Sequence, residues 1–286
     1  MKNNFILLIT IFLMAVGCKK EKNTANNNGK NNTTNPPSKT YLVTKITERT
    51  NLDTTHYVKF EFTYDDKNRI TQMTLPPDSY FGLGDTGPSL IYNYTYDSAG
   101  NLSTATYYQN TLYSATTSFT YSSDSIKVFF DNGVVTDNYA YTISKNRITS
   151  VNVDPRNHFS FDYDSIGNVT SYTQTDIGGI IGPRTYLTYD QKKNPFSMIG
   201  GNNPQIVYFL IFAVDFIDIV VYPGTTNGFS NINNLTSNPA GESEVSSFNG
   251  TTISYLYNSD GFPVFAAVES DTGSNNIFLT YTYLVK

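Results

Sequence analysis

Two Asp-Thr-Gly triplets are the first candidates for a catalytic site in this sequence. Asp85-Thr86-Gly87 and Asp271-Thr272-Gly273 match the triplet that brings two carboxylates together around one shared proton for peptide hydrolysis. Such triplets follow buried apolar strands, whereas here they follow Gly82-Leu83-Gly84 and Val268-Glu269-Ser270. We therefore interpret both as polar loops and expect Asp85 and Asp271 to lie far apart.

Other catalytic patterns are absent or lack their structural context. The segment Gly82–Gly87 has the glycines of a dinucleotide fingerprint, but a strand-like Leu90-Ile91-Tyr92 follows it instead of a helix. His56 and His158 are isolated, with no metal-ligand spacing, and no Gly-x-Ser-x-Gly elbow occurs. We predict no catalytic residue, cofactor or metal site. A carboxylate pair for glycoside hydrolysis stays open, because distances in space cannot be read from a sequence.

The composition favours strands over helices. The 286 residues include 23 Tyr and 19 Phe but no Trp, and charged residues make up only 15%. A formal net charge of −5 gives no basic surface for nucleic acid, so no nucleic-acid partner is predicted. The single Cys excludes an intrachain disulfide. The length allows one large all-β domain or two ordinary domains.

The N-terminus is laid out like a bacterial lipoprotein signal. A short positive region precedes an apolar run from Phe5 to Val16, which is too short to span a bilayer comfortably. The run ends in Ala15-Val16-Gly17-Cys18, similar to a lipobox although Ala15 stands where Leu is usual. We predict a signal peptide over residues 1–17 and lipidation of Cys18. An ordinary secretory signal is the alternative.

Residues 18–39 are predicted to be a disordered tether. They are rich in Asn, Thr and Lys and have no apolar periodicity. As a random coil they would span about 25 Å. Lys19 after the Cys is not the Asp associated with inner-membrane retention, so we expect anchoring in the outer membrane, with the face undetermined.

A hairpin repeat organises the rest of the chain. Tyr92, Tyr94 and Tyr96 recur with the period of a strand that has one buried face. The segment Asp97–Gly100 then has the residues of a tight turn, with Asp at its first position and Gly at its last. The same logic assigns these repeat-turn residues: Asp65, Asn68, Asp97, Gly100, Asp164, Gly167, Asn258 and Gly261.

The alternation predicts one buried aromatic face. Between the aromatic positions stand polar residues such as Thr63, Thr95 and Thr282, which we expect to be more exposed. The aromatic residues expected on the buried face are Phe62, Tyr64, Tyr94, Tyr96, Phe161, Tyr163, Tyr257 and Tyr281.

One apolar stretch interrupts the repeats. Residues 206–221 are too short for a membrane span and carry Asp215 and Asp218. A helix would place the two carboxylates on one face, whereas the β-branched content favours a strand. We predict a short helix that plugs one end of the sheet with both carboxylates exposed; two strands of the sheet are the alternative.

The units Tyr96–Leu102 and Tyr163–Val169 resemble the Tyr-Asp repeat of the Rhs/YD-repeat proteins. The chain with its lipobox and Asn-rich tether is also similar to a group of lipoproteins of Gram-negative envelopes. The resemblance covers residues 57–284 and implies a long antiparallel β-strip, and we predict one YD-repeat-like β domain over residues 40–286. The fold class is therefore predicted as all-β, an antiparallel meander of hairpins that forms a curved elongated sheet. The units are too few and too degenerate for an enclosing shell, so toxin encapsulation does not carry over.

Four Ser or Thr residues that directly follow an Asp are candidates for modification. In most of them the next residue is small or apolar. This pattern is similar to an acceptor for O-glycosylation of exported proteins, although ordinary turn chemistry also explains it. The candidate acceptors are Thr54, Ser98, Ser125 and Ser165.

These observations predict a lipoprotein of the outer membrane with a non-enzymatic role. The folded part would bind a glycan, a peptide or a partner protein, or act as a structural component. The lipid anchor would make the membrane its first partner. The alternatives are an envelope hydrolase that uses paired carboxylates and a cup that carries lipid.

Overall fold

The structure is a computed structural model. It describes residues 38–52, 55–77, 89–110, 112–154, 157–175, 178–182, 184–203, 206–207, 210–211, 233–238, 251–270 and 276–286. The chain divides into two units, Met1–Ser38 and Lys39–Lys286. The fold of the second unit is described below.

The described residues of the second unit form a sheet of 17 strands. Alternating aromatic and polar residues form several of them, among them β2, β4, β10 and β17, as expected of strands with one buried face. The strands are β1 (Tyr41–Thr50), β2 (Tyr57–Tyr64), β3 (Ile70–Leu75), β4 (Leu90–Tyr96), β5 (Leu102–Gln109), β6 (Leu112–Tyr121), β7 (Ser125–Asp131), β8 (Thr136–Ser144), β9 (Arg147–Asp154), β10 (Asn157–Tyr163), β11 (Val169–Thr175), β12 (Thr185–Tyr186), β13 (Thr188–Lys193), β14 (Asn233–Asn238), β15 (Thr251–Tyr257), β16 (Pro263–Ser270) and β17 (Ile277–Val285).

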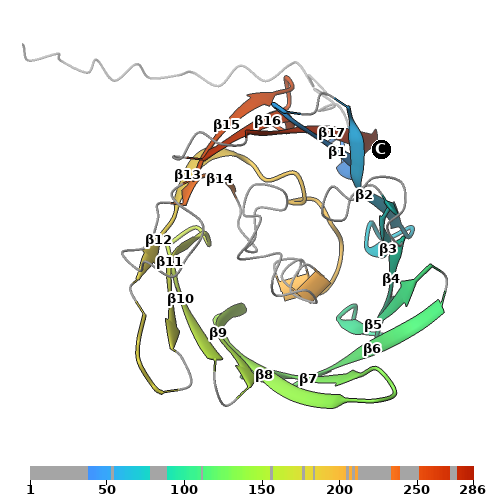
Figure 1. The fold of residues 1–286 in the computed structure, drawn as a ribbon, viewed down its shortest axis with the longest axis vertical. Helices are drawn as coiled ribbons and strands as arrows, with labels where there is room; N and C mark the ends of the chain where they lie inside the picture. The colour runs from blue at the N-terminus through green and yellow to red at the C-terminus, as the bar shows by residue number, and fades with distance from the viewer. Residues whose placement is uncertain are drawn as a thin grey trace, which may run out of the picture. The chain divides into compact units, whose positions relative to one another are not determined.

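The strands follow one another as an antiparallel meander. Each strand from β1 to β11 pairs with the next, and so does each from β13 to β16. Leu187 separates β12 from β13, which pair with β11 and β14 respectively. In addition β1 pairs with β17, from Tyr41↔Val285 to Thr50↔Ile277. The sheet therefore curves until its first and last strands lie side by side (Figure 1). The predicted fold class, a curved all-β meander, is confirmed.

The predicted aromatic face forms the core. Phe62, Tyr94, Phe161 and Tyr281 are buried. Of the others, Tyr64, Tyr96 and Tyr163 are partly buried and pack against the same cluster, and Tyr257 is half-buried. The intervening Thr63, Thr95 and Thr282 are exposed. The prediction is confirmed, and full burial of each such ring contributes about 1.5–3 kcal/mol.

A segment between β13 and β14 also contributes to this core. We call residues 194–211 the strap; its described part is residues 194–203 with Ile206, Val207, Leu210 and Ile211. These last four residues are helical (Figure 1). Their side chains are buried in the core cluster. The predicted helix is confirmed for them. Asp215 and Asp218 lie outside the described residues, as does the rest of the predicted helix.

The meander places its connections at two ends. Because neighbouring strands are antiparallel, the turns at 65–69, 97–101, 122–124, 145–146, 164–168 and 258–262 share one end, which we call the turn end. The chain enters β1 at this end and leaves β17 there, where the Thr40 N–H donates to the Lys286 carbonyl at 3.0 Å. The described residues of the connections that follow β1, β5, β7 and β11 share the opposite end, the loop end; they are 51–52, 55–56, 110, 132–135, 178–182 and 184. In the described part of the chain, no helix is long and apolar enough to cross a membrane.

Candidate functional site at the hairpin turns

The Asp65 carboxylate organises the turn between β2 and β3. Its Oδ1 accepts the backbone N–H groups of Lys67 and Arg69, each at 2.9 Å. Its Oδ2 accepts Arg69 Nε at 2.7 Å and forms an ion pair with the same guanidinium. Burial raises the pKa of Asp65, but the hydrogen bonds and charge of Arg69 outweigh it, so the pKa lies below its usual value. The carboxylate is therefore committed to the turn as an anion.

Asp97 and Asp164 repeat this arrangement with Asn in place of Arg. Asp97 Oδ1 accepts the Asn101 N–H at 2.8 Å, and its Oδ2 accepts the Asn101 side-chain amide at 2.9 Å. Asp164 does the same with Asn168, both at 2.9 Å, and also accepts the N–H of Gly167 at 2.6 Å. The hydrogen bonds from Asn101 lower the pKa of Asp97, and those at Asp164 lower its pKa against the opposing effect of burial.

The remaining predicted turn residues behave as expected. Asn258 Oδ1 accepts the N–H groups of Asp260 and Phe262, each at 3.0 Å, so an amide oxygen replaces the carboxylate. The last position of each turn has a positive φ, which Gly and Asn adopt at little cost. The positions are Asn68 (62°), Gly100 (88°), Gly167 (116°) and Gly261 (82°). The structure thus gives all eight repeat-turn residues a role in turn geometry.

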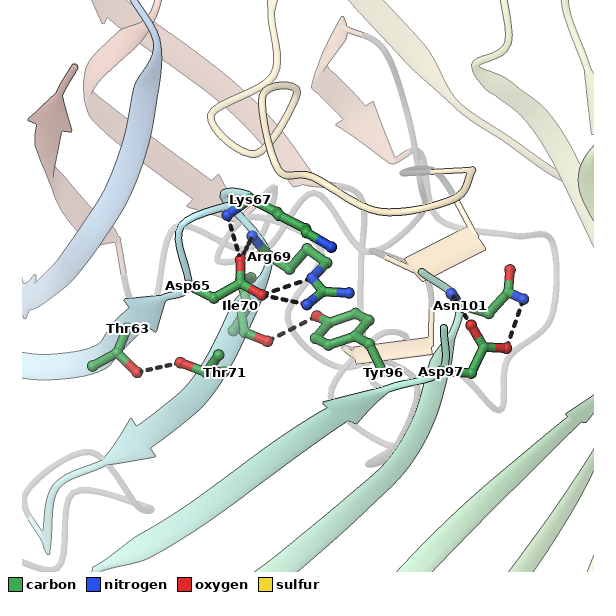
Figure 2. Close-up of polar contacts among 9 residues, drawn as sticks. All are labelled: Thr63, Asp65, Lys67, Arg69, Ile70, Thr71, Tyr96, Asp97 and Asn101. Atoms are coloured by element: carbon green, nitrogen blue, oxygen red, sulfur yellow. Dashed lines mark hydrogen bonds and ion pairs between the residues drawn. The ribbon is translucent and has the colours of Figure 1, made fainter. Parts of the chain in front are cut away.

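Four tyrosines near the turn end donate hydrogen bonds to a backbone carbonyl of a neighbouring strand. Tyr96 Oη donates to the Ile70 carbonyl at 2.8 Å, and the Arg69 guanidinium lies over the Tyr96 ring at 4.4 Å (Figure 2). Tyr163 Oη donates to the Ile148 carbonyl at 2.5 Å, with Arg147 over its ring at 5.3 Å. The same bond joins Tyr64 to Val43 and Tyr283 to Pro263, each at 2.7 Å. Burial raises the pKa of all four tyrosines, so their hydroxyls stay protonated donors.

The strap lies directly against several of these turns. The N–H of Gly200 donates to the Asn68 carbonyl at 2.8 Å, and that of Asn202 donates to the Gly100 carbonyl at 2.9 Å. The Asn202 side chain donates to Asn101 Oδ1 at 2.9 Å, and that of Asn203 donates to the Asn146 carbonyl at 2.7 Å. A Cβ on Gly200 would overlap the carbonyl oxygen of Lys67, so only glycine permits this approach. The strap therefore joins hairpins that are far apart in the sequence.

Two tyrosine–carboxylate hydrogen bonds also lie near the turn end. Tyr41 Oη donates to Asp260 Oδ2, which also forms an exposed ion pair with Lys39 at 3.3 Å. The hydrogen bond from Tyr41 lowers the pKa of Asp260, and Lys39 lowers it further. Tyr257 Oη donates to Asp190 Oδ2. Each carboxylate thus has a phenol partner, and the two bonds link β1 to the turn between β15 and β16 and β13 to the end of β15.

The candidates for chemistry are not assembled into a catalytic group in the described part of the chain. His158 contacts Asn152 Oδ1 and Ser160 Oγ, and His56 is exposed before β2. No group of three His, Cys, Asp or Glu side chains that could hold a metal occurs among the described residues. The predicted separation of Asp85 and Asp271 falls on residues outside those described, as does the lipidation of Cys18.

The candidate glycosylation acceptors differ in their surroundings. Ser98 and Ser165 are exposed at the tips of their turns. Ser125 is the half-buried first residue of β7, and its hydroxyl lies 2.7 Å from Ser122 Oγ. Thr54 lies outside the described residues. Their modification stays a prediction, with Ser98 and Ser165 the more accessible acceptors.

Sequence reasoning missed the strap contacts and the guanidinium stacking. Gly200, Asn202 and Asn203 belong to no repeat unit, so no local pattern indicates that they reach the turns. Arg69 and Arg147 both follow an Asn that ends a turn, and this shared position was the available signal for their role.

Comparison with known proteins shows similarity in structure alone. No protein-family model matches the chain, and no curated protein matches it. The structure is similar to a porin-like protein from Bacteroides uniformis, with a TM-score of 0.38, 13% identity, and coverage of 86% of this chain and 99% of that chain. It is also similar to a porin-like protein from Bacteroides vulgatus, with a TM-score of 0.39, 12% identity, and coverage of 85% and 99%.

Proposed function

We propose that this chain is a lipid-anchored protein of the outer membrane whose folded unit is a non-enzymatic binding or structural module. The proposal rests on two independent features. The sequence Ala15-Val16-Gly17-Cys18 after an apolar run supports the lipid anchor. The chemistry of the turns supports the binding or structural role, and the ligand class is a glycan, a peptide or a partner protein.

One observation carries the second part. The carboxylates that recur with the repeat are used to hold turns, because Asp65, Asp97 and Asp164 each accept several N–H groups of their own turn. Their pKa values are lowered, whereas a general acid for glycoside hydrolysis needs a raised one. These carboxylates are therefore suited to architecture and unsuited to acid catalysis.

The core packing favours the same role over the lipid-carrying cup. The buried face of the sheet packs against the strap residues Phe196, Ile199, Val207 and Leu210. Phe62 and Phe196 make an edge-to-face contact with ring centroids 5.2 Å apart. A lipid chain on this face would have to displace these side chains.

Fractionation and lipid labelling of the full chain in a Gram-negative host test the anchor. The wild-type chain should incorporate radiolabelled palmitate and sediment with outer membranes. The Cys18→Ala variant should incorporate none and appear in the soluble envelope fraction, with a Ser98→Ala variant as a matched control that stays membrane-bound. Palmitate incorporation by Cys18→Ala, or a wild-type chain without lipid, would overturn the anchor.

A further inference from the structure

The loop end carries exposed apolar side chains on two neighbouring hairpins. Leu112 and Tyr113 lie at the start of β6, and Val134 and Val135 lie in the connection between β7 and β8. Their exposed fractions reach 72% for Leu112 and 91% for Val134. We call these four residues the tip patch. Single exposed apolar residues are ordinary, but a group on adjacent hairpins indicates an interaction surface.

Strand pairing brings the two parts of the tip patch together. β6 pairs with β7 with Thr116 opposite Asp131, so the segments just beyond these residues emerge side by side. The Tyr113 hydroxyl contacts Thr116 Oγ1 at 3.3 Å and the Asp131 carbonyl at 3.5 Å. The Tyr113 ring also packs edge-to-face on Tyr108, with centroids 6.2 Å apart. The pairing of β6 with β7 thus positions the two parts of the patch next to each other.

Carboxylates flank the tip patch. Asp131 ends β7 and Asp137 lies near the start of β8, on either side of Val134 and Val135. Asp131 Oδ1 accepts the Gly133 N–H at 2.7 Å, which fixes the connection but leaves its charge uncompensated. Neither carboxylate forms an ion pair with any residue that the structure describes. The local charge is therefore negative around an apolar centre.

This chemistry selects one class of occupant. An anionic lipid surface would be repelled by the two carboxylates. A glycan would need aromatic faces, whereas three of the four patch residues are aliphatic. An apolar centre with a charged rim is the usual anatomy of a protein interface. We propose that the tip patch binds a partner protein that presents an apolar surface flanked by basic side chains.

The position of the patch agrees with this role. The chain enters the folded unit at the turn end, where Lys39 and Thr40 precede β1, and the strap covers several turns of that end. The tip patch lies at the opposite end of the strands. The inference deepens the proposed binding role by naming its partner class, and it rests on that role.

Site-specific photo-cross-linking of the full chain in its native host tests the proposal. A photo-reactive benzoylphenylalanine replaces Leu112 in one variant and Val134 in another, and Leu256 on β15 in a control. Leu256 is a matched position because it is also strongly exposed, at 63%. We expect the two patch positions to cross-link the same protein, identified by mass spectrometry, and the control position to miss it.

Affinity measurements on the purified pair then test the chemistry. We expect Val134→Ser with Val135→Ser to weaken binding by about tenfold or more, since truncated apolar contacts at an interface centre have effects of this size. Asp137→Lys should weaken binding at low salt and reduce its salt dependence. A Thr95→Ser control on β4 should bind like the wild type, and circular dichroism should show that every variant is folded.

Four outcomes would overturn the proposal: cross-links to lipid, cross-links to a second copy of this chain, equal cross-linking at Leu256, and an affinity unchanged by the patch variants. The cross-linking and affinity tests could fail while the chain still incorporates palmitate and binds another ligand elsewhere. The proposed function would then stand. A chain that is neither lipidated nor bound to any ligand would remove both.

Discussion

The hydroxyl of Tyr96 donates a hydrogen bond to the backbone carbonyl of Ile70, 2.8 Å away, and thereby joins two successive hairpins. Tyr96 ends β4 and Ile70 begins β3, so the bond crosses the turn end from one repeat to the previous one. Tyr163 and Ile148 make the equivalent bond in a later repeat. The Tyr of the Tyr-Asp pair thus links repeats, while the Asp closes the turn within one repeat.

Replacing Tyr96 with Phe should destabilise the fold. Tyr96→Phe removes the donor and keeps the ring, so the Ile70 carbonyl loses a partly buried partner at a cost of about 0.5–1.5 kcal/mol. Urea denaturation followed by circular dichroism measures the change. Tyr113→Phe is the matched control, because its hydroxyl makes only long, exposed contacts. An equal loss in both variants would show that the link between hairpins contributes nothing of its own.

Replacing Gly200 with Ala should displace the strap. The added Cβ would overlap the Lys67 carbonyl oxygen, a backbone atom that cannot move aside as a flexible side chain would, so about 1–3 kcal/mol of stability should be lost. Gly133→Ala is the control, since its Cβ meets no atom within 4 Å and only its positive φ of 79° is strained. Hydrogen exchange should rise at the turns near Asn68 and Gly100 in Gly200→Ala alone. Unchanged exchange there would argue against the strap contacts.

Stability should be greatest between the titration ranges of the turn carboxylates and of the buried tyrosines. The folded-state pKa values of Asp65, Asp97 and Asp164 are lowered, so their contribution is present above the ordinary Asp pKa and is lost as the pH falls through the folded value. The pKa of Tyr96 is raised, so its contribution is present below the ordinary Tyr pKa and is lost as the pH rises above it.

Two measurements check this pH dependence. Urea midpoints should fall below about pH 4 and above about pH 10, the ordinary values for Asp and Tyr. Near pH 11 the native chain should show less phenolate absorbance than the unfolded chain. A native titration that matches the unfolded one would contradict the burial of the tyrosine hydroxyls.

Glycosylation of the turn hydroxyls is a prediction about the protein from its native host. Ser98→Ala and Ser165→Ala should each remove a glycan mass and leave the fold intact, because the turns depend on Asp97, Gly100, Asp164 and Gly167. Ser98→Thr should retain the modification and serves as the control. Intact-mass spectrometry decides the matter: a wild-type mass equal to that of the lipidated polypeptide would reject the prediction.

The sequence alone determined the repeating hairpins and their buried face. Turn closure by Asp65 or Asp97 is local, because the carboxylate reaches only N–H groups within the next few residues. The alternation of Tyr94 and Tyr96 with polar residues is likewise local, since strand geometry fixes which side chains share a face. These features follow from chemistry between near neighbours and could be read residue by residue.

The closure of the sheet and the links between distant hairpins come from tertiary contacts. The pairing of Tyr41 with Val285 and the strap contact of Gly200 with Asn68 join residues that no repeat pattern relates. Such contacts depend on the curvature accumulated over many strands and on which end each connection reaches. A sequence specifies that curvature only through the sum of all its pairings, and so these contacts appear only in the folded chain.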